Sequence, residues 1–554
     1  MQNLMIDLTK LFQKDERIFA DGKLLKNKLT ELALKHDQPL IELLLSDEKA
    51  KEHFFIEWTF KKDKVLVFDK DKFAAFVNNK EFLPNSFTSF KNKIGLMSNG
   101  DYLKEKNDVV LVWAYKDCVL EGGQDKEDQK RDEIFYNEVL APDEINRLFE
   151  EKVFTNFKRV DAKGEHKLDR FNETDNLIIK GNNLLALHSL KKRYHNKIKL
   201  IYIDPPYNTE GVDDSFKYND KFNHSTWLTF MRNRLELAKD LLANNGAIYV
   251  QLDYNEVHYC KILMDEIFGG DNFQREIIWR IGWISGYKSA SKNWIRNHDS
   301  ILFYSKDKTQ LEFIKKYIPY PKDYERRDGA KPEGEGYPYE DTWNCNDLDP
   351  LNSIAIVSFS KEKVGNFKGQ KNEALIQRII EAHTREGEIV LDFFSGTGTT
   401  ARTCLKLNRQ WISIEQIEGQ MKKQIDKLRQ VIAGDQTGIS KAVSWKGGGS
   451  FVYAELKEWN EQYMTEIKEA NTTRKLLNIY ERMRKEAFFR YDVDPSKFDE
   501  REFENLPLKE QKQVLCECLD KNHLYVNLSE MDDATYKINA DDKKLNKEFY
   551  KTVV

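Results

Sequence analysis

Short apolar runs alternate with amphipathic stretches between residues 176 and 253, and again between residues 388 and 432. The apolar runs are rich in β-branched and aromatic residues and predict strands at 176–181, 198–204, 246–253, 388–394 and 411–416. The stretches at 182–194, 227–245 and 401–408 have the apolar spacing of helices. Strands that alternate with helices of this length predict an α/β fold with a parallel, doubly wound sheet and helices on both faces.

This alternation is absent from three parts of the chain. Residues 1–150 mix helical spacing with strand-like runs, and residues 281–365 are rich in proline and glycine with little periodicity. After Gly447–Gly449 the pattern is charged and largely helical. The predicted domains are an N-terminal domain for dimer or partner contacts at 1–150, two halves of the sheet domain at 151–280 and 366–435, an inserted domain at 281–365 and a mostly helical domain at 436–554.

Composition narrows the class of protein. The chain has 554 residues, 40% of them hydrophobic, and no apolar run long enough to span a membrane. The N-terminus lacks a secretory pattern, and none of the six cysteines forms a CxxC pair, so we expect a reduced, cytoplasmic protein without a metal site. The net charge of −4 does not exclude DNA binding, because only the contacting face must be basic.

The first candidate for chemistry is Asp204-Pro205-Pro206-Tyr207, directly after the strand 198–204. The exocyclic amine of a base is a poor nucleophile because its lone pair is delocalised into the ring. A carboxylate on Asp204 and the carbonyl of Pro205 could accept its N–H bonds, while Pro206 stiffens the turn and Tyr207 offers a ring for stacking. A base inside a duplex must be flipped out to reach such a pocket. The alternative is a proline-stiffened turn that only ends a strand.

The second candidate is the loop between the strand at 388–394 and the helix at 401–408. Its chemistry-bearing residues are Asp392, Phe393, Phe394, Ser395, Gly396, Gly398, Thr399 and Thr400. The loop lacks the lysine of a phosphate loop and the third glycine of a dinucleotide fingerprint. Glu415 ends the next strand and could bind ribose hydroxyls. The pair therefore suits adenosine without phosphates, as in S-adenosylmethionine, and the alternative is a tight turn with an incidental acid.

DPPYNT followed much later by DFFSGTGTT resembles the amino-methyltransferases in which the catalytic motif precedes the cofactor motif, and Asp in DPPY resembles the adenine-specific members. SFKYNDKFNHSTWLTFMRNRLELA, FKNKIGL and SWKGGGSFVYAEL are similar to the modification subunits of type III restriction–modification systems. The resemblance implies methylation of adenine N6 in duplex DNA, a homodimer and a separate ATPase–nuclease subunit. It also implies that Asn182 flanks the cofactor adenine. Lys371 would lie near the cofactor carboxylate, although Asn372 replaces the proline usual after it.

The insert is predicted to be the target-recognition domain. Between Lys288 and Lys331 there are eleven Lys/Arg against six Asp/Glu, with aromatic residues interleaved. Basic groups position a protein on phosphates, and base edges give specificity. Lys288, Lys292, Arg326 and Arg327 are the candidate DNA contacts. The acidic stretch 333–349 is interpreted as a solvated loop.

Three other interpretations stay open. The chain could be a non-catalytic recognition subunit, an orphan methyltransferase without a restriction partner, or an RNA methyltransferase. The intact motifs argue against the first, and the basic, aromatic insert favours DNA over RNA. No motor motif is present in the sequence, so restriction would need another subunit. As a DNA methyltransferase, the chain is expected to act on the bacterial nucleoid.

Overall fold

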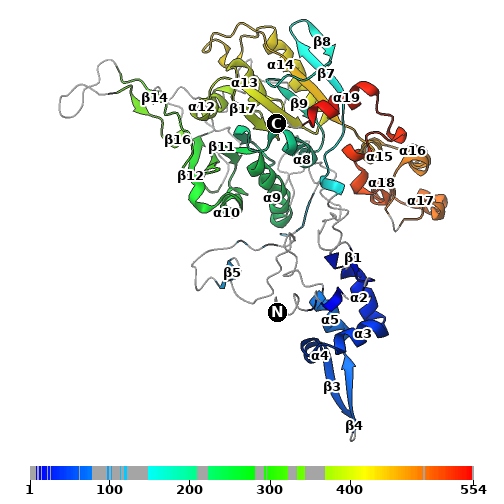
Figure 1. Cartoon of the computed structure of the whole chain (residues 1–554). Helices are drawn as coiled ribbons and strands as arrows, with labels where there is room; N and C mark the ends of the chain where they lie inside the picture. Colours follow the sequence, from blue (N-terminus) through cyan, green and yellow to red (C-terminus); the bar gives the residue numbers. More distant parts are fainter. Residues whose placement is uncertain are drawn as a thin grey trace. The chain divides into compact units, whose positions relative to one another are not determined.

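The computed structural model describes residues 147–208, 223–280, 292–294, 296–321, 334–343, 369–490 and 493–551, with shorter stretches between residues 8 and 120. The chain divides into two compact units, Met1–Val109 with Asn137–Pro142 and Val110–Tyr136 with Asp143–Val554. Each unit has its own hydrophobic core. Figure 1 colours the chain from blue at the N-terminus to red at the C-terminus.

The first unit combines short helices with a β-hairpin. Its main elements are α2 (Lys26–Leu34), α3 (Gln38–Leu45), α4 (Glu48–Phe54), β3 (Phe55–Phe60), β4 (Asp63–Phe68) and α5 (Lys70–Val77). Two-residue strands form the pairs β1 (Phe19–Ala20) with β2 (Lys23–Leu24) and β5 (Met97–Ser98) with β6 (Asp101–Tyr102). Phe54 and Phe73 make an edge-to-face contact with ring centroids 4.9 Å apart at the centre of the core.

The second unit is built on one sheet of eleven strands, counted over the described residues. In spatial order they are β16 (Thr342–Trp343), β12 (Phe273–Arg280), β13 (His298–Ser305), β11 (Leu242–Leu252), β10 (Ile198–Ile203), β17 (Ile389–Asp392), β18 (Gln410–Glu415), β9 (Leu177–Lys180), β19 (Phe451–Leu456), β7 (Phe154–Asp161) and β8 (Gly164–Lys167). The strands from β11 to β19 are all parallel, which confirms the predicted α/β class. Antiparallel strands extend this core at both edges, so the sheet is mixed.

The strand order reverses between β10 and β17. After β10 the chain continues to β11 on one side, whereas after β17 it continues to β18 on the other side. In doubly wound sheets, ligands bind at the carboxyl ends of the strands where the strand order reverses in this way. Both predicted motifs follow these strands.

Helices cover both faces of the parallel core (Figure 1). One face carries α8 (Asn183–Tyr194), α9 (His224–Leu241) and α10 (Val257–Phe268), and the other carries α12 (Glu373–His383), α13 (Thr399–Lys406) and α14 (Glu418–Ile432). In β10, Ile201 and Ile203 belong to the core on the side of α8, α9 and α10. Leu200 and Tyr202 belong to the core on the side of α12, α13 and α14. Because successive side chains point to opposite faces, a strand covered on both sides is apolar throughout.

Helices dominate the described part of the C-terminal region (Figure 1). They are α15 (Asn460–Glu469), α16 (Thr473–Glu486), α17 (Glu500–Asn505), α18 (Leu508–Cys518) and α19 (Ala540–Phe549). Asn546 of α19 donates to the Phe154 carbonyl and accepts from the Phe154 amide, which ties this helix to β7. Among the described residues, no helix is both long and apolar enough to cross a membrane.

Two predicted domain boundaries cut across the sheet. Strand β13 lies within the predicted insert 281–365, yet it pairs with β11 from Ala247 to Leu252. Strand β19 lies beyond the predicted boundary at 435, yet it pairs with β9 and β7. Each of these strands pairs with strands that are distant in sequence. The residues next to it along the chain do not indicate which strands those partners are. The sheet domain therefore includes parts of both segments.

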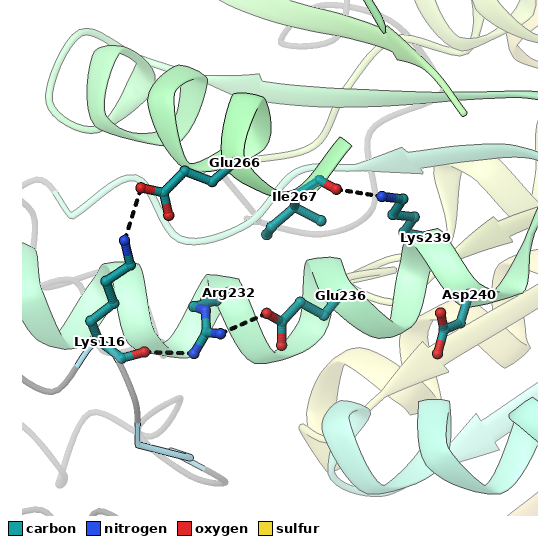
Figure 2. A pocket seen from close by; sticks show the side chains of 7 residues that line it. All are labelled: Lys116, Arg232, Glu236, Lys239, Asp240, Glu266 and Ile267. Atoms are coloured by element: carbon teal, nitrogen blue, oxygen red, sulfur yellow. Dashed lines mark hydrogen bonds and ion pairs between the residues drawn. The ribbon is translucent and has the colours of Figure 1, made fainter. Parts of the chain in front are cut away.

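A hollow of about 310 Å³ lies between α9, α10 and the segment around Lys116 (Figure 2). Lys116 pairs with Glu266 at 2.9 Å, Arg232 pairs with Glu236 at 2.9 Å, and Lys239 donates to the Ile267 carbonyl at 2.6 Å. Because these charges already satisfy one another, we interpret the hollow as a seam that fastens the Lys116 segment to the sheet domain. It is not our candidate for the site.

A buried charge cluster supports the loop that follows β17. Glu373 accepts from Arg402 at 3.2 Å and from Lys406 at 2.7 Å, and all three side chains are almost wholly buried. Arg402 also donates to the Thr397 carbonyl at 2.6 Å. Buried charges are tolerated only when paired and hydrogen-bonded, so this cluster holds the first turn of α13 and the loop before it in one arrangement.

We therefore expect Arg402→Met to lower the free energy of unfolding by about 3–5 kcal/mol, because it leaves the carboxylate of Glu373 short of one buried donor. Chemical denaturation measures this change. The matched control is Arg482→Met, which breaks an exposed pair with Glu466 and should cost less than about 1 kcal/mol. Equal effects in the two variants would contradict the role given to Arg402.

Candidate active site

The two predicted motifs meet at one edge of the sheet. Asp204 directly follows β10, and Asp392 ends β17. These strands are neighbours and parallel, with Leu200 opposite Val390 and Ile201 opposite Leu391. Parallel pairing in this register brings both carboxylates to the same end of the sheet. Burial raises the pKa of Asp392, and the charge of Asp204 adds to that rise.

Asp204 is held by one cation and keeps one oxygen available. Lys371 Nζ donates to Asp204 Oδ2 at 2.5 Å. The other oxygen, Oδ1, is shielded from solvent and has no hydrogen-bond partner among the described residues. A buried acceptor without a partner is costly unless a ligand completes it. The site therefore presents one carboxylate oxygen to an N–H or O–H donor.

Burial raises the pKa of Asp204 above its usual range. The charge of Lys371, followed by its hydrogen bond, opposes that rise. An opposite charge favours the ionised form of a carboxyl group, and only an ionised carboxylate offers both oxygens purely as acceptors. In this structure Lys371 therefore acts on the candidate catalytic carboxylate.

The turn after Asp204 is fixed by contacts on both sides. Trp227 Nε1 donates to the Pro206 carbonyl at 2.9 Å, so the Pro205 carbonyl is the remaining candidate for a second acceptor. Tyr207 is half-buried, and its hydroxyl donates to Asp299 Oδ2 at 3.2 Å. Its ring lies 5.1 Å from Lys371 Nζ. Lys371 therefore contacts both the Asp204 carboxylate and the face of the Tyr207 ring.

The loop after β17 is organised around Asp392. Its Oδ1 accepts from the Phe394 amide at 3.0 Å, and its Oδ2 accepts from the Thr400 hydroxyl at 2.6 Å. Burial raises the pKa of Asp392 to about 7, and these two hydrogen bonds oppose the rise. Asp392 thus ties the strand end to the first turn of α13.

Two glycines let this loop turn tightly. Gly396 and Gly398 have φ values of +52° and +75°, which side chains other than glycine rarely adopt. A Cβ at Gly398 would lie 2.4 Å from Cγ of Gln424, whose side chain accepts from the Ser395 hydroxyl at 3.1 Å. The positive φ and the neighbouring Gln424 therefore disfavour any residue with a Cβ at position 398.

Glu415 lies at the end of the next strand, beside the same loop. Its Oε2 accepts from the Gly396 amide at 2.8 Å, and its Oε1 accepts from the amides of Gln416 and Ile417 at 3.0 and 2.8 Å. An ionised carboxylate has about four acceptor positions, so one position on Oε2 remains for a ligand hydroxyl. Burial raises the pKa of Glu415 to about 7, against these backbone hydrogen bonds.

The other predicted site residues have different positions. Asn182 is the N-cap of α8, and its side chain accepts from the Leu184 amide at 3.0 Å, so it orders the end of β9 beside Glu415. Phe393 is buried in the core, and Thr399 donates to the Lys371 carbonyl at 3.4 Å. Lys292 is exposed. Lys288, Arg326 and Arg327 lie outside the described residues.

Sequence reasoning missed the residues that support the motifs from elsewhere. Asn183 Nδ2 donates to the Phe393 carbonyl at 2.9 Å, and Arg234 Nε donates to Asn183 at 2.7 Å. Gln251 Nε2 donates to Asp299 at 2.9 Å, beside Tyr207. These are polar side chains within or beside apolar elements. That is the one signal in the sequence that could have indicated them.

Two family models match this chain. A DNA methylase model matches residues 198–427, and a model of the type III restriction/modification enzyme methylation subunit matches residues 37–96. The first range includes both motifs and the paired strands β10 and β17.

The chain also resembles curated proteins and solved structures. The probable type III restriction-modification enzyme HindVI Mod subunit of Haemophilus influenzae is 34% identical over an alignment of 744 residues, which covers 99% of this chain and 98% of that protein. The type III EcoP15I Mod subunit of Escherichia coli is 34% identical over 168 residues, 25% of each protein. The structure of the M1.HpyAVI–SAM complex is 21% identical with a TM-score of 0.30 and covers 45% of this chain and 99% of that one. The cytosine-N4-specific PvuII DNA methyltransferase is 15% identical with a TM-score of 0.33, over 49% and 90%.

The pKa of Glu415, about 7, predicts a pH dependence of nucleoside binding. Three amides and a ribose hydroxyl together need all the acceptor positions of the ionised carboxylate, and protonation removes one of them. A raised pKa means that Glu415 is mostly protonated at pH 6 and mostly ionised at pH 8. Calorimetry with 5′-methylthioadenosine, which has no amino-acid group, should give an affinity about tenfold higher at pH 8. Glu415→Gln should flatten this dependence, and an unchanged slope in that variant would exclude Glu415 as its cause.

Proposed function

The chain belongs to the methylation (Mod) subunits of type III restriction–modification enzymes, which are S-adenosylmethionine-dependent DNA methyltransferases, and from this membership we propose that it methylates N6 of a target adenine. The adenine is flipped out of the duplex into the pocket formed by Asp204, Pro205, Pro206 and Tyr207. The reason to propose adenine is Asp204 at the start of this motif, because Ser at that position is typical of the cytosine-N4 enzymes.

One observation carries this proposal above the others. Asp204 Oδ1 is a buried oxygen without a partner among the described residues, and it lies at the strand end next to the glycine loop. An exocyclic amine has two N–H bonds to donate. Asp204 Oδ1 and the Pro205 carbonyl provide two acceptors in one turn, and a ring that stacks on Tyr207 would bring its amine toward them.

The residues beside the glycine loop fit S-adenosylmethionine. Glu415 keeps one acceptor position for a ribose hydroxyl, and Asn182 orders the strand end beside it. Buried carboxylates at this edge suit a ligand that carries positive charge and no phosphate. The cofactor would supply a methyl group activated by its sulfonium charge.

Each residue of the pocket has a defined task in the transfer. The attacking nitrogen gains positive charge as its bond to carbon forms, so an ionised Asp204 stabilises the transition state more than the bound substrate. Lys371 favours the ionised form of Asp204 through Oδ2 and leaves Oδ1 for the amine. The proton released from the amine goes to Asp204 Oδ1 and then to solvent. Tyr207 holds the base by stacking.

We further propose that the chain works as a homodimer with a separate ATPase–nuclease restriction subunit. The names of its Mod relatives describe them as subunits of larger restriction–modification enzymes. About 110 residues form the first compact unit, apart from the sheet domain that carries both motifs. A unit of that size outside the catalytic domain suits contacts with partners.

We assign the contacts of the chain with duplex DNA to the basic insert, including Lys288, Lys292, Arg326 and Arg327.

Asp204→Ala is expected to reduce methyl transfer by at least about a thousandfold, because it removes the acceptor on which the developing charge depends. DNA affinity should fall less than about threefold, since phosphate contacts supply most of it. Radiolabelled methyl incorporation and a gel-shift titration measure the two quantities. Near-normal turnover would exclude Asp204 as the catalytic carboxylate.

The dimer is tested by mixing two inactive versions. One carries Asp204→Ala, and the other carries alanine at Lys288, Lys292, Arg326 and Arg327. Replacing the whole 288–331 segment is unsuitable because it would remove strand β13 from the sheet. If one protomer contacts DNA while the other methylates, mixing should restore up to about a quarter of wild-type activity, as random pairing gives. No restored activity, or a fully active monomer by light scattering, would contradict the division of labour.

A further inference from the structure

The hydroxyl of Tyr207 is attached to a network that lies outside both motifs. Asp299 Oδ2 accepts from this hydroxyl at 3.2 Å and from Gln251 Nε2 at 2.9 Å. Gln251 in turn accepts from the Tyr202 hydroxyl at 2.6 Å. Tyr202, Gln251 and Asp299 are all buried. The position of Tyr207 is therefore determined by buried groups on β10, β11 and β13.

Asp299 is suited to this task by its place in the sheet. It lies on β13 opposite Trp279 of β12, at the end of β13 that adjoins the carboxyl end of β11. Its side chain is 6% exposed. A buried carboxylate is tolerated when it is paired and hydrogen-bonded, and Tyr207, Gln251 and Arg296 donate to Asp299 here. The hydrogen bond from Tyr207 is therefore one of three that stabilise the buried carboxylate.

Arg296 connects Asp299 to the chain that leads out of the sheet. Its guanidinium donates to Asp299 Oδ1 and lies 3.9 Å from Asp253 Oδ2. Arg296 is one-third exposed and follows Lys292 and Trp294, which are exposed. The segment between β12 and β13 is also where the predicted recognition insert begins. The ion pair between Arg296 and Asp299 therefore connects the exposed segment that contains Lys292 and Trp294 to the carboxylate that accepts from the Tyr207 hydroxyl.

We propose that Asp299 is a positioning residue for methyl transfer, which fixes the Tyr207 ring against the target base through its hydroxyl and links that ring, through Arg296, to the segment entering the insert. The inference rests on the proposed adenine methylation and adds a residue outside both motifs. Asp299 touches neither base nor cofactor. It restricts the ring to one orientation, so that a stacked adenine presents its amine to Asp204. Misplacement of a reacting group by about 1 Å can cost about a hundredfold in rate.

The test is a double-mutant cycle between Asp299 and Tyr207. Methyl incorporation into genomic DNA from a host without the gene is measured for wild type, Asp299→Ala, Tyr207→Phe and the double variant. Asp299→Ala should lower kcat about ten- to a hundredfold and leave the KM for S-adenosylmethionine within about twofold. If Asp299 acts through the hydroxyl, the double variant should be no slower than Tyr207→Phe alone.

A second substitution separates the two links of Asp299. Asp299→Asn keeps an oxygen that can accept from Tyr207 and Gln251 but loses the charge that binds Arg296. It should therefore recover most of the rate that Asp299→Ala loses, and it replaces that variant in the cycle if Asp299→Ala does not fold. Loss of rate by Asp299→Asn equal to that of Asp299→Ala would show that the Tyr207 hydrogen bond is not what Asp299 provides.

A matched control exists on the same strand. Tyr304 donates to Asp265 at 2.7 Å, which is the same kind of tyrosine–carboxylate pair at the opposite end of β13. Asp265→Ala should leave the rate of methyl transfer unchanged. The proposal is overturned if Asp299→Ala is fully active, or if it slows Tyr207→Phe by the same factor as wild type. Failure of the wild-type chain to methylate adenine would instead reject the proposed function.

Discussion

Strands β10 and β17 run side by side and parallel, although 185 residues separate their ends, Ile203 and Ile389, along the chain. This pairing brings Asp204 and the glycine loop after Asp392 to one edge of the sheet. The strand order reverses between these two strands, which is where doubly wound sheets bind their ligands. Every further contact of the site adjusts side chains within a frame that this one pairing provides.

Much of that frame could be predicted from the sequence, because strands covered by helices on both faces are apolar runs with clear limits. The predicted strands of the parallel core, its helices and both motifs are where the pattern indicated. The strands that flank this predicted core on either side were not predictable in the same way. Strands β13 and β19 pair with segments far along the chain, and a local apolar pattern does not identify a distant partner. Predicted domain boundaries therefore fell on the wrong side of both strands.

The site was predictable to a different degree. Asp204 and Glu415 became candidates because each proposed chemistry needs a particular residue type at the end of a strand. Residues that support the motifs, such as Asp299 and Arg402, gave no comparable signal, since a single polar residue in an apolar stretch has many explanations. Lys371 shows a further limit. Its motif indicated a contact with the cofactor carboxylate, whereas the structure pairs it with Asp204. Only a three-dimensional distance distinguishes two anions that one lysine could reach.

The charges at this edge also explain why the loop suits one class of ligand. Burial raises the pKa values of Asp204, Asp392 and Glu415, and the charge of Asp392 adds to the rise at Glu415. Glycine loops before a helix commonly bind phosphates through backbone amides. Here the Gly396 amide already donates to Glu415. A bound phosphate would also lie close to the carboxylates of Asp392 and Glu415, which would repel it. A positively charged ligand is attracted to these carboxyl groups, because its charge favours their ionised forms, which burial disfavours. The same buried carboxylates that exclude a phosphate therefore favour a cationic nucleoside.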